Sequence, residues 1–62
     1  MLRFKIGNVV KIATNEHIPI FTKGDIVKVI EIDEDSTFMP YYVQSIEGTS
    51  ELWVCNHNLQ FI

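Results

Sequence analysis

Cysteine is almost absent from this chain of 62 residues, in which Cys55 stands alone. A single cysteine excludes an internal disulfide framework and is typical of a reducing compartment. No apolar run approaches the roughly 18 residues of a membrane-spanning helix. Residues 1–5 also lack the apolar stretch of a signal peptide. We therefore expect a cytoplasmic protein.

Glycine and proline are scarce too, with three and two residues respectively. Hydrophobic residues make up 47% of the chain and charged residues 21%, which argues against disorder. A chain this short does not divide into two hydrophobic cores. We expect one domain over residues 1–62, with a thin core.

Positive charge is missing from the second half of the chain. All five Lys and Arg residues lie in residues 1–28, whereas residues 29–62 hold six Asp and Glu and no cation. Charged runs usually face solvent, so one interpretation is a solvated surface with ion pairs between the two halves. The alternative is an acidic patch over residues 31–35 that docks on a basic partner.

Two nine-residue segments, 4–12 and 21–29, share the pattern Phe-x-x-Gly-[Asn/Asp]-[Val/Ile]-Val-Lys-[Ile/Val]. Gly7 and Gly24 suit turns that need a positive φ angle. Asn8 and Asp25 can hydrogen-bond nearby backbone groups. The β-branched residues that follow favour strands. Each segment is therefore predicted to be a turn, covered by its phenylalanine, that leads into a strand.

The remaining pattern also predicts short strands, with no helical spacing over ten or more residues. We expect strands at about 8–13, 25–32, 41–46, 51–55 and 59–62, and one 3₁₀ turn at 56–58. Residues 26–32 are apolar on both faces, which predicts a bend in that strand. We assign Phe4, Phe21, Tyr41 and Phe61 to the core. Five short strands in this length indicate an all-β, partly open barrel.

Three groups of residues resemble a known family. Phe21–Val27 reads Phe-x-x-Gly-Asp-x-Val, Pro40–Val43 reads Pro-Tyr-x-Val, and Trp53, Val54 and Leu59 follow. Together they resemble the SH3-like barrels, and in particular the small stand-alone versions encoded by bacteriophages and the mind-bomb-type and KOW-type domains. The resemblance covers nearly the whole chain and implies a five-stranded SH3-like barrel with a short 3₁₀ turn before the last strand.

The resemblance implies a binding module and leaves the ligand open. The chain lacks the Ala-Leu-Tyr-Asp-Tyr opening of peptide-binding SH3 domains, so no PxxP site is carried over. Its turns are acidic or neutral, unlike the basic RNA-facing loops of ribosomal KOW domains. The likeness to phage proteins implies an accessory protein that modulates a host protein in the host cytoplasm.

Few residues of the sequence are candidates for catalysis or for binding a metal ion. One cysteine and two histidines fall short of the four ligands of a structural zinc site, and residues 33–35 lack the calcium-loop pattern. Cys55 and His57 could pair as thiol and base, but no glycine-rich loop accompanies them. We expect no catalytic residue, metal site or cofactor, with Cys55 buried and both histidines on the surface.

Protein binding is the leading hypothesis, because aromatic residues and methionine are favoured interface anchors. Tyr42 is predicted to face outward while Tyr41 faces inward. Trp53 is left open between a core position and an exposed anchor. The predicted partner-binding residues are Phe38, Met39, Tyr42, Trp53, Glu34 and Asp35.

Three alternatives remain open. Nucleic acid could bind a lysine face, although the net charge of −3 repels phosphate. The acids at 31–35 with Glu47 and Glu51 could imitate DNA in an inhibitor. The chain could also self-associate through an open sheet edge. The lysines of the nucleic-acid hypothesis are Lys5, Lys11, Lys23 and Lys28.

Overall fold

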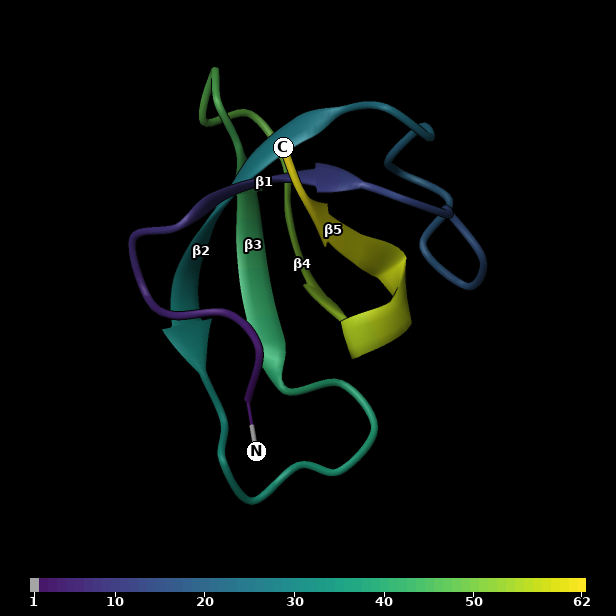
Figure 1. The fold of residues 1–62 in the computed structure, drawn as a ribbon. Coiled ribbons are helices and arrows are strands. Elements are labelled where there is room, and N and C mark those ends of the chain that lie inside the picture. The colour runs from purple at the N-terminus through teal and green to yellow at the C-terminus, as the bar shows by residue number, and fades with distance from the viewer. Residues whose placement is uncertain (1) are drawn as a thin grey trace.

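The computed structural model describes residues 2–62 and has five β-strands (Figure 1). They are β1 (Val9–Ile12), β2 (Ile26–Ile32), β3 (Tyr41–Ser45), β4 (Glu51–Val54) and β5 (Leu59–Phe61), with the 3₁₀ turn η1 (Asn56–Asn58) before β5. Each strand begins and ends within one residue of the predicted positions, and the bounds of η1 agree with the prediction.

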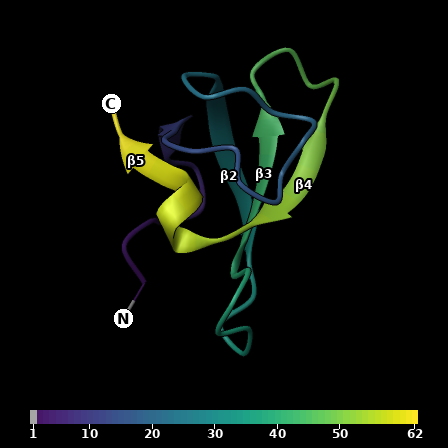
Figure 2. The same cartoon turned by 90° about the vertical axis from the view of Figure 1, so that its right-hand side faces the viewer.

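The five strands form one antiparallel sheet in the order β4-β3-β2-β1-β5. Figure 2 shows β2, β3 and β4 side by side, with η1 and β5 on the other side of the molecule. Within residues 2–62, β4 and β5 do not pair with each other, so the sheet stays unclosed. The predicted all-β fold with five strands and a 3₁₀ turn before the last strand is confirmed.

A β-bulge lies in β2. The pairing with β3 moves from Val29–Val43 to Glu31–Tyr42, so β2 has one extra residue at this point. Val29 is buried, whereas beyond the bulge it is Ile32 that packs on the core. The inward-facing positions thus change from odd to even numbers, which explains why both faces of this segment are apolar.

The two repeated segments form the predicted turns. Gly7 and Gly24 have φ angles of 96° and 97°, which L-residues rarely adopt. The side chains of Asn8 and Asp25 each accept a hydrogen bond of 2.9 Å from the backbone N–H three residues earlier. Both turns therefore close in the same way.

The core lies between the β1–β5 side of the sheet and the β2–β3–β4 side. Phe4 and Phe21 are buried in it, as the repeat predicted, and the Phe4 ring meets the Tyr41 ring edge-on at 5.3 Å. The buried hydrophobic cluster contains Phe4, Val10, Ile12, Ile18, Phe21, Val27, Val29, Tyr41, Val43, Val54 and Leu59.

The core assignment of Phe61 is wrong. Its side chain is 56% exposed, although its ring lies 4.7 Å from the Phe4 ring. Phe61 pairs with Val10 at the end of the three-residue strand β5, between the exposed residues Gln60 and Ile62. It packs on the rim of the core.

Candidate functional site

The outward side of β2, β3 and β4 carries a continuous set of polar and aromatic side chains. The ladder places Tyr42 beside Glu31 and Trp53, and Gln44 beside Lys28 and Glu51. Directly paired residues share one face of a sheet, so these form two neighbouring rows. We call this set the outer face; its members are Lys28, Glu31, Tyr42, Gln44, Glu51 and Trp53.

Tyr42 and Trp53 form an aromatic pair across β3 and β4. Their ring centroids are 4.9 Å apart, with an interplanar angle of 43°. Both side chains are half-buried, whereas the neighbouring Tyr41 is buried. The prediction that Tyr42 faces outward is therefore confirmed, and Trp53, left open by the sequence, lies beside it outside the core.

Glu51 is held next to this pair by two hydrogen bonds. The Tyr42 hydroxyl donates to Oε1 at 2.9 Å, and the Gln44 amide donates to Oε2 at 2.7 Å. Both donors are neutral, so they orient the carboxylate without removing its charge. The same hydrogen bond is the main cause that raises the pKa of Tyr42, with smaller contributions from burial and from the charges of Glu51 and Glu31.

The outer face holds two acids, Glu31 and Glu51, and one cation, Lys28, so it keeps a net negative charge. Within residues 2–62, one ion pair occurs, between His57 and Glu16 at 3.2 Å, and it lies outside this face. Gln44 separates Lys28 from Glu51 in their row. Glu31 and Glu51 are thus available to a positively charged partner.

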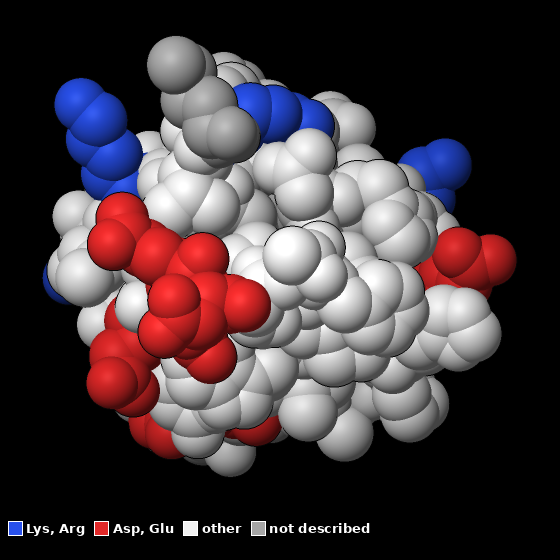
Figure 3. Space-filling model, turned by 90° about the horizontal axis from the view of Figure 1, so that it is seen from below, with Lys and Arg blue, Asp and Glu red and all other residues white. Residues whose placement is uncertain are grey.

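The other predicted partner-binding residues lie in the link between β2 and β3. Phe38 is 62% exposed, Met39 is half-buried, and Glu34 and Asp35 are exposed. Figure 3 looks onto this end of the molecule and shows acidic side chains gathered beside a broad uncharged surface. Within residues 2–62, no hydrogen bond or aromatic contact joins these residues to the Tyr42–Trp53 pair. The predicted partner-binding residues therefore come from two segments of the fold, the β3–β4 ladder and the link between β2 and β3.

The four lysines of the nucleic-acid hypothesis are also divided. Val9 pairs with Lys28 and Lys11 pairs with Ile26, so Lys11 and Lys28 share the outward side of the β1–β2 ladder. Lys5 and Lys23 lie in the two glycine turns. No aromatic residue is paired within the β1–β2 ladder, and of the four lysines it is Lys28 that also belongs to the outer face with Tyr42 and Trp53.

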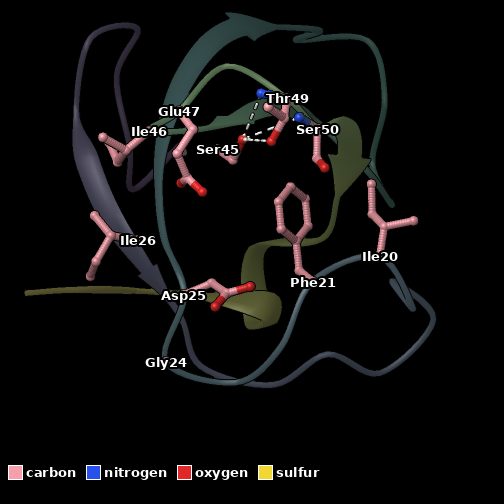
Figure 4. Close-up of a pocket in the computed structure, with 10 residues that line it drawn as sticks. All are labelled: Ile20, Phe21, Gly24, Asp25, Ile26, Ser45, Ile46, Glu47, Thr49 and Ser50. Carbon is pink, nitrogen blue, oxygen red and sulfur yellow. Dashed lines mark hydrogen bonds between the residues drawn. The ribbon is translucent and has the colours of Figure 1, made fainter.

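A surface hollow of about 440 Å³ opens between residues 20–26 and the β3–β4 hairpin (Figure 4). Phe21 lies in its floor, and the Ser45 hydroxyl accepts the backbone N–H groups of Thr49 and Ser50 at 3.1 Å. The Asp25 carboxylate accepts the N–H of Thr22. These polar groups serve the turns that they close, and the lining contains neither histidine nor cysteine.

Cys55 is buried and His57 is exposed, as predicted. Burial, helped by the charge of Glu16, raises the pKa of the Cys55 thiol and disfavours the reactive thiolate. Among the described residues, the His57 ring has a hydrogen bond to Glu16 and none to the Cys55 thiol. Among residues 2–62, no three His, Cys, Asp or Glu side chains gather closely enough to hold a metal ion.

Sequence reasoning found Tyr42 and Trp53 but missed the role of Gln44, and it named Glu51 only as a possible DNA-imitating acid. The signal was present, because residues 42 and 44 share a face by the two-residue period of a strand, as do 51 and 53. Only the pairing of β3 with β4 brings the two sets together.

No helix among the described residues has the length and apolar character needed to cross a membrane.

Comparisons with known proteins found no relative of this chain. No protein-family model matches the sequence, and no curated protein or solved structure is significantly similar to it.

Proposed function

We propose that this chain is a non-enzymatic protein-interaction module that docks its outer face on a basic surface of a partner protein. The observation that carries the proposal is the Tyr42–Trp53 pair beside the oriented carboxylate of Glu51. Half-buried aromatic side chains give large contact area at low entropic cost, and they dominate the energetics of many interfaces. The two acids beside them, Glu31 and Glu51, outnumber the single cation Lys28 and favour a basic partner.

We also propose that the module is an accessory protein of a bacteriophage that modulates a host protein in the host cytoplasm. The sequence resemblance to phage-encoded SH3-like barrels supports this origin. The unclosed five-stranded sheet and the 3₁₀ turn before β5 agree with the architecture that the resemblance implies. Binding would act by occupying the partner's surface.

Site-specific crosslinking in a bacterial lysate tests the docking surface. A photoreactive residue at Lys28, which lies on the outer face beside Gln44, should crosslink a partner protein. Trp53→Ala should reduce the yield at least about tenfold, because a central aromatic anchor is lost. Phe61→Ala is the matched control, since Phe61 is an exposed aromatic residue outside the outer face. Equal yields from both variants, each shown to be folded by circular dichroism, would contradict the proposal.

Nucleic-acid binding through the β1–β2 ladder is the second candidate, favoured by the shared face of Lys11 and Lys28. Tight binding of generic DNA or RNA that weakens steeply with salt would support it and would displace the protein-binding proposal. Lys11→Gln with Lys28→Gln should then reduce the slope of log K against log salt by about two.

A further inference from the structure

The two edges of the sheet differ in how their backbone groups are used. Beside β5, the Arg3 guanidinium donates to the Leu59 carbonyl at 3.3 Å, and the Phe4 ring packs on Phe61. Arg3 thus occupies one backbone carbonyl at the edge of β5. Beyond β4, no further strand follows in residues 2–62, and Figure 2 shows β4 as the last strand on its side of the sheet.

The ladder determines which groups of β4 point away from the sheet. The N–H of Ser45 donates to the Ser50 carbonyl at 2.8 Å, so this pair is hydrogen-bonded. In an antiparallel ladder, hydrogen-bonded pairs alternate with pairs whose backbone groups point outward. The backbone groups of Leu52 and Val54 therefore face β3, and those of Glu51 and Trp53 face the open edge. Within residues 2–62, no hydrogen bond to Glu51 or Trp53 occupies these groups.

The side chains along this edge define what could pair with it. Glu51 and Trp53 lie on the outer face, and Leu52 between them packs against the core. A residue paired with Glu51 would place its side chain next to a fixed carboxylate, and one paired with Trp53 would lie against an aromatic face. Arginine satisfies both positions, because it binds carboxylates and stacks on aromatic rings. The residue opposite Leu52 would be apolar.

We propose that β4 accepts an extended segment of the partner as a sixth, antiparallel strand, with basic residues opposite Glu51 and Trp53 and an apolar residue between them. This inference rests on the proposed function and specifies its partner. Backbone hydrogen bonds from two residues of β4 supply the pairing, and the outer face supplies the specificity. β4 has only four residues, so the added strand is short and exchanges rapidly.

A five-residue peptide, acetyl-Thr-Arg-Val-Arg-Thr-amide, tests the pairing against the ¹⁵N-labelled protein. Binding should shift the amide resonances of Glu51 and Trp53 and slow their hydrogen exchange. N-methylation of both arginines removes the two donors that face β4 and should weaken binding about tenfold or more. N-methylation of the valine is the matched control, because that N–H points away from β4. Equal binding of both methylated peptides would overturn the proposal.

Charge is tested with Glu51→Gln, which keeps the shape of the side chain, and with Glu47→Gln, which removes a charge in the β3–β4 hairpin. The first should weaken peptide binding about fivefold and the second hardly at all. Absence of any shift at Glu51 and Trp53 at about 1 mM peptide would also overturn strand addition. The crosslinking experiment at Lys28 separately decides whether the outer face still binds a partner in another way.

Discussion

Gly7 and Gly24 occupy equivalent positions at opposite ends of the β1–β2 ladder. The N–H of Gly7 donates to the Val29 carbonyl at 2.7 Å, and the N–H of Gly24 donates to the Ile12 carbonyl at 2.8 Å. Ile12 and Val29 are themselves the last residues of the two repeated segments. Each repeat thus closes its turn on the end of the other, and the two pair around an approximate two-fold axis at Val10–Val27.

This symmetry predicts equal costs for Gly7→Ala and Gly24→Ala. Neither new Cβ would meet an atom within 4 Å, so the cost arises from the positive φ alone, about 1–2 kcal/mol of unfolding free energy for each. Urea unfolding measures it. Asparagine tolerates positive φ better than alanine, so either Gly→Asn variant should cost less. A cost of Gly24→Ala several times that of Gly7→Ala would contradict the equivalence.

The glycine turns could be predicted from the sequence because their determinants are local: a glycine, a short polar side chain and a phenylalanine within five residues. The outer face could be predicted only in part, since the period of a strand shows which residues share a side but not which strands pair. Phe61 shows a second limit. Alternation places its side chain on the same side of β5 as the buried Leu59, yet it cannot show that Phe61 stays 56% exposed.

The adjacent tyrosines should differ in their effect on stability. The buried Tyr41 hydroxyl accepts the backbone N–H groups of Arg3 at 3.0 Å and Phe4 at 3.3 Å, so Tyr41→Phe leaves both without that acceptor. We expect a loss of about 1–3 kcal/mol in unfolding free energy. Tyr42→Phe removes an exposed hydrogen bond to Glu51 and should cost less than about 1 kcal/mol. Equal midpoints in urea would show that the Tyr41 hydroxyl does not secure the N-terminal segment.

Asn58 joins η1 to the link that follows β1. Its side chain is fully buried, accepts the N–H of Cys55 at 2.8 Å, and donates to the carbonyls of Thr14 at 3.0 Å and Glu16 at 3.1 Å. Asn58→Ala removes all three bonds and leaves their partners unsatisfied, so we expect a loss of about 2–4 kcal/mol.

Thermal unfolding followed by circular dichroism measures the effect of Asn58→Ala, with Asn56→Ala as the control. Asn56 belongs to the same turn but is exposed, and its substitution should change stability by less than about 0.5 kcal/mol. If the two variants melt together, the three bonds of Asn58 contribute nothing that water cannot replace.

The ionisation of Tyr42 reports directly on the arrangement of the outer face. Its pKa lies above the ordinary value of 10.0, first because the phenol donates a hydrogen bond to Glu51, and then because of burial and the charges of Glu51 and Glu31. The folded state holds this proton more tightly than the unfolded chain. The resulting contribution to stability is therefore present below pH 10 and is lost as the pH rises through the raised pKa.

Glu51→Gln should lower the pKa of Tyr42 toward its ordinary value. The substitution removes the negative charge beside the phenol and weakens the hydrogen bond that the phenol donates. A pH titration of ¹³C-labelled tyrosine rings by NMR resolves Tyr42 from the buried Tyr41. Glu47→Gln removes a charge that does not contribute to the raised pKa of Tyr42 and should leave the titration unchanged. If Glu51→Gln also leaves it unchanged, the carboxylate is not held against the hydroxyl in solution, and the oriented acceptor on which the docking surface depends is absent.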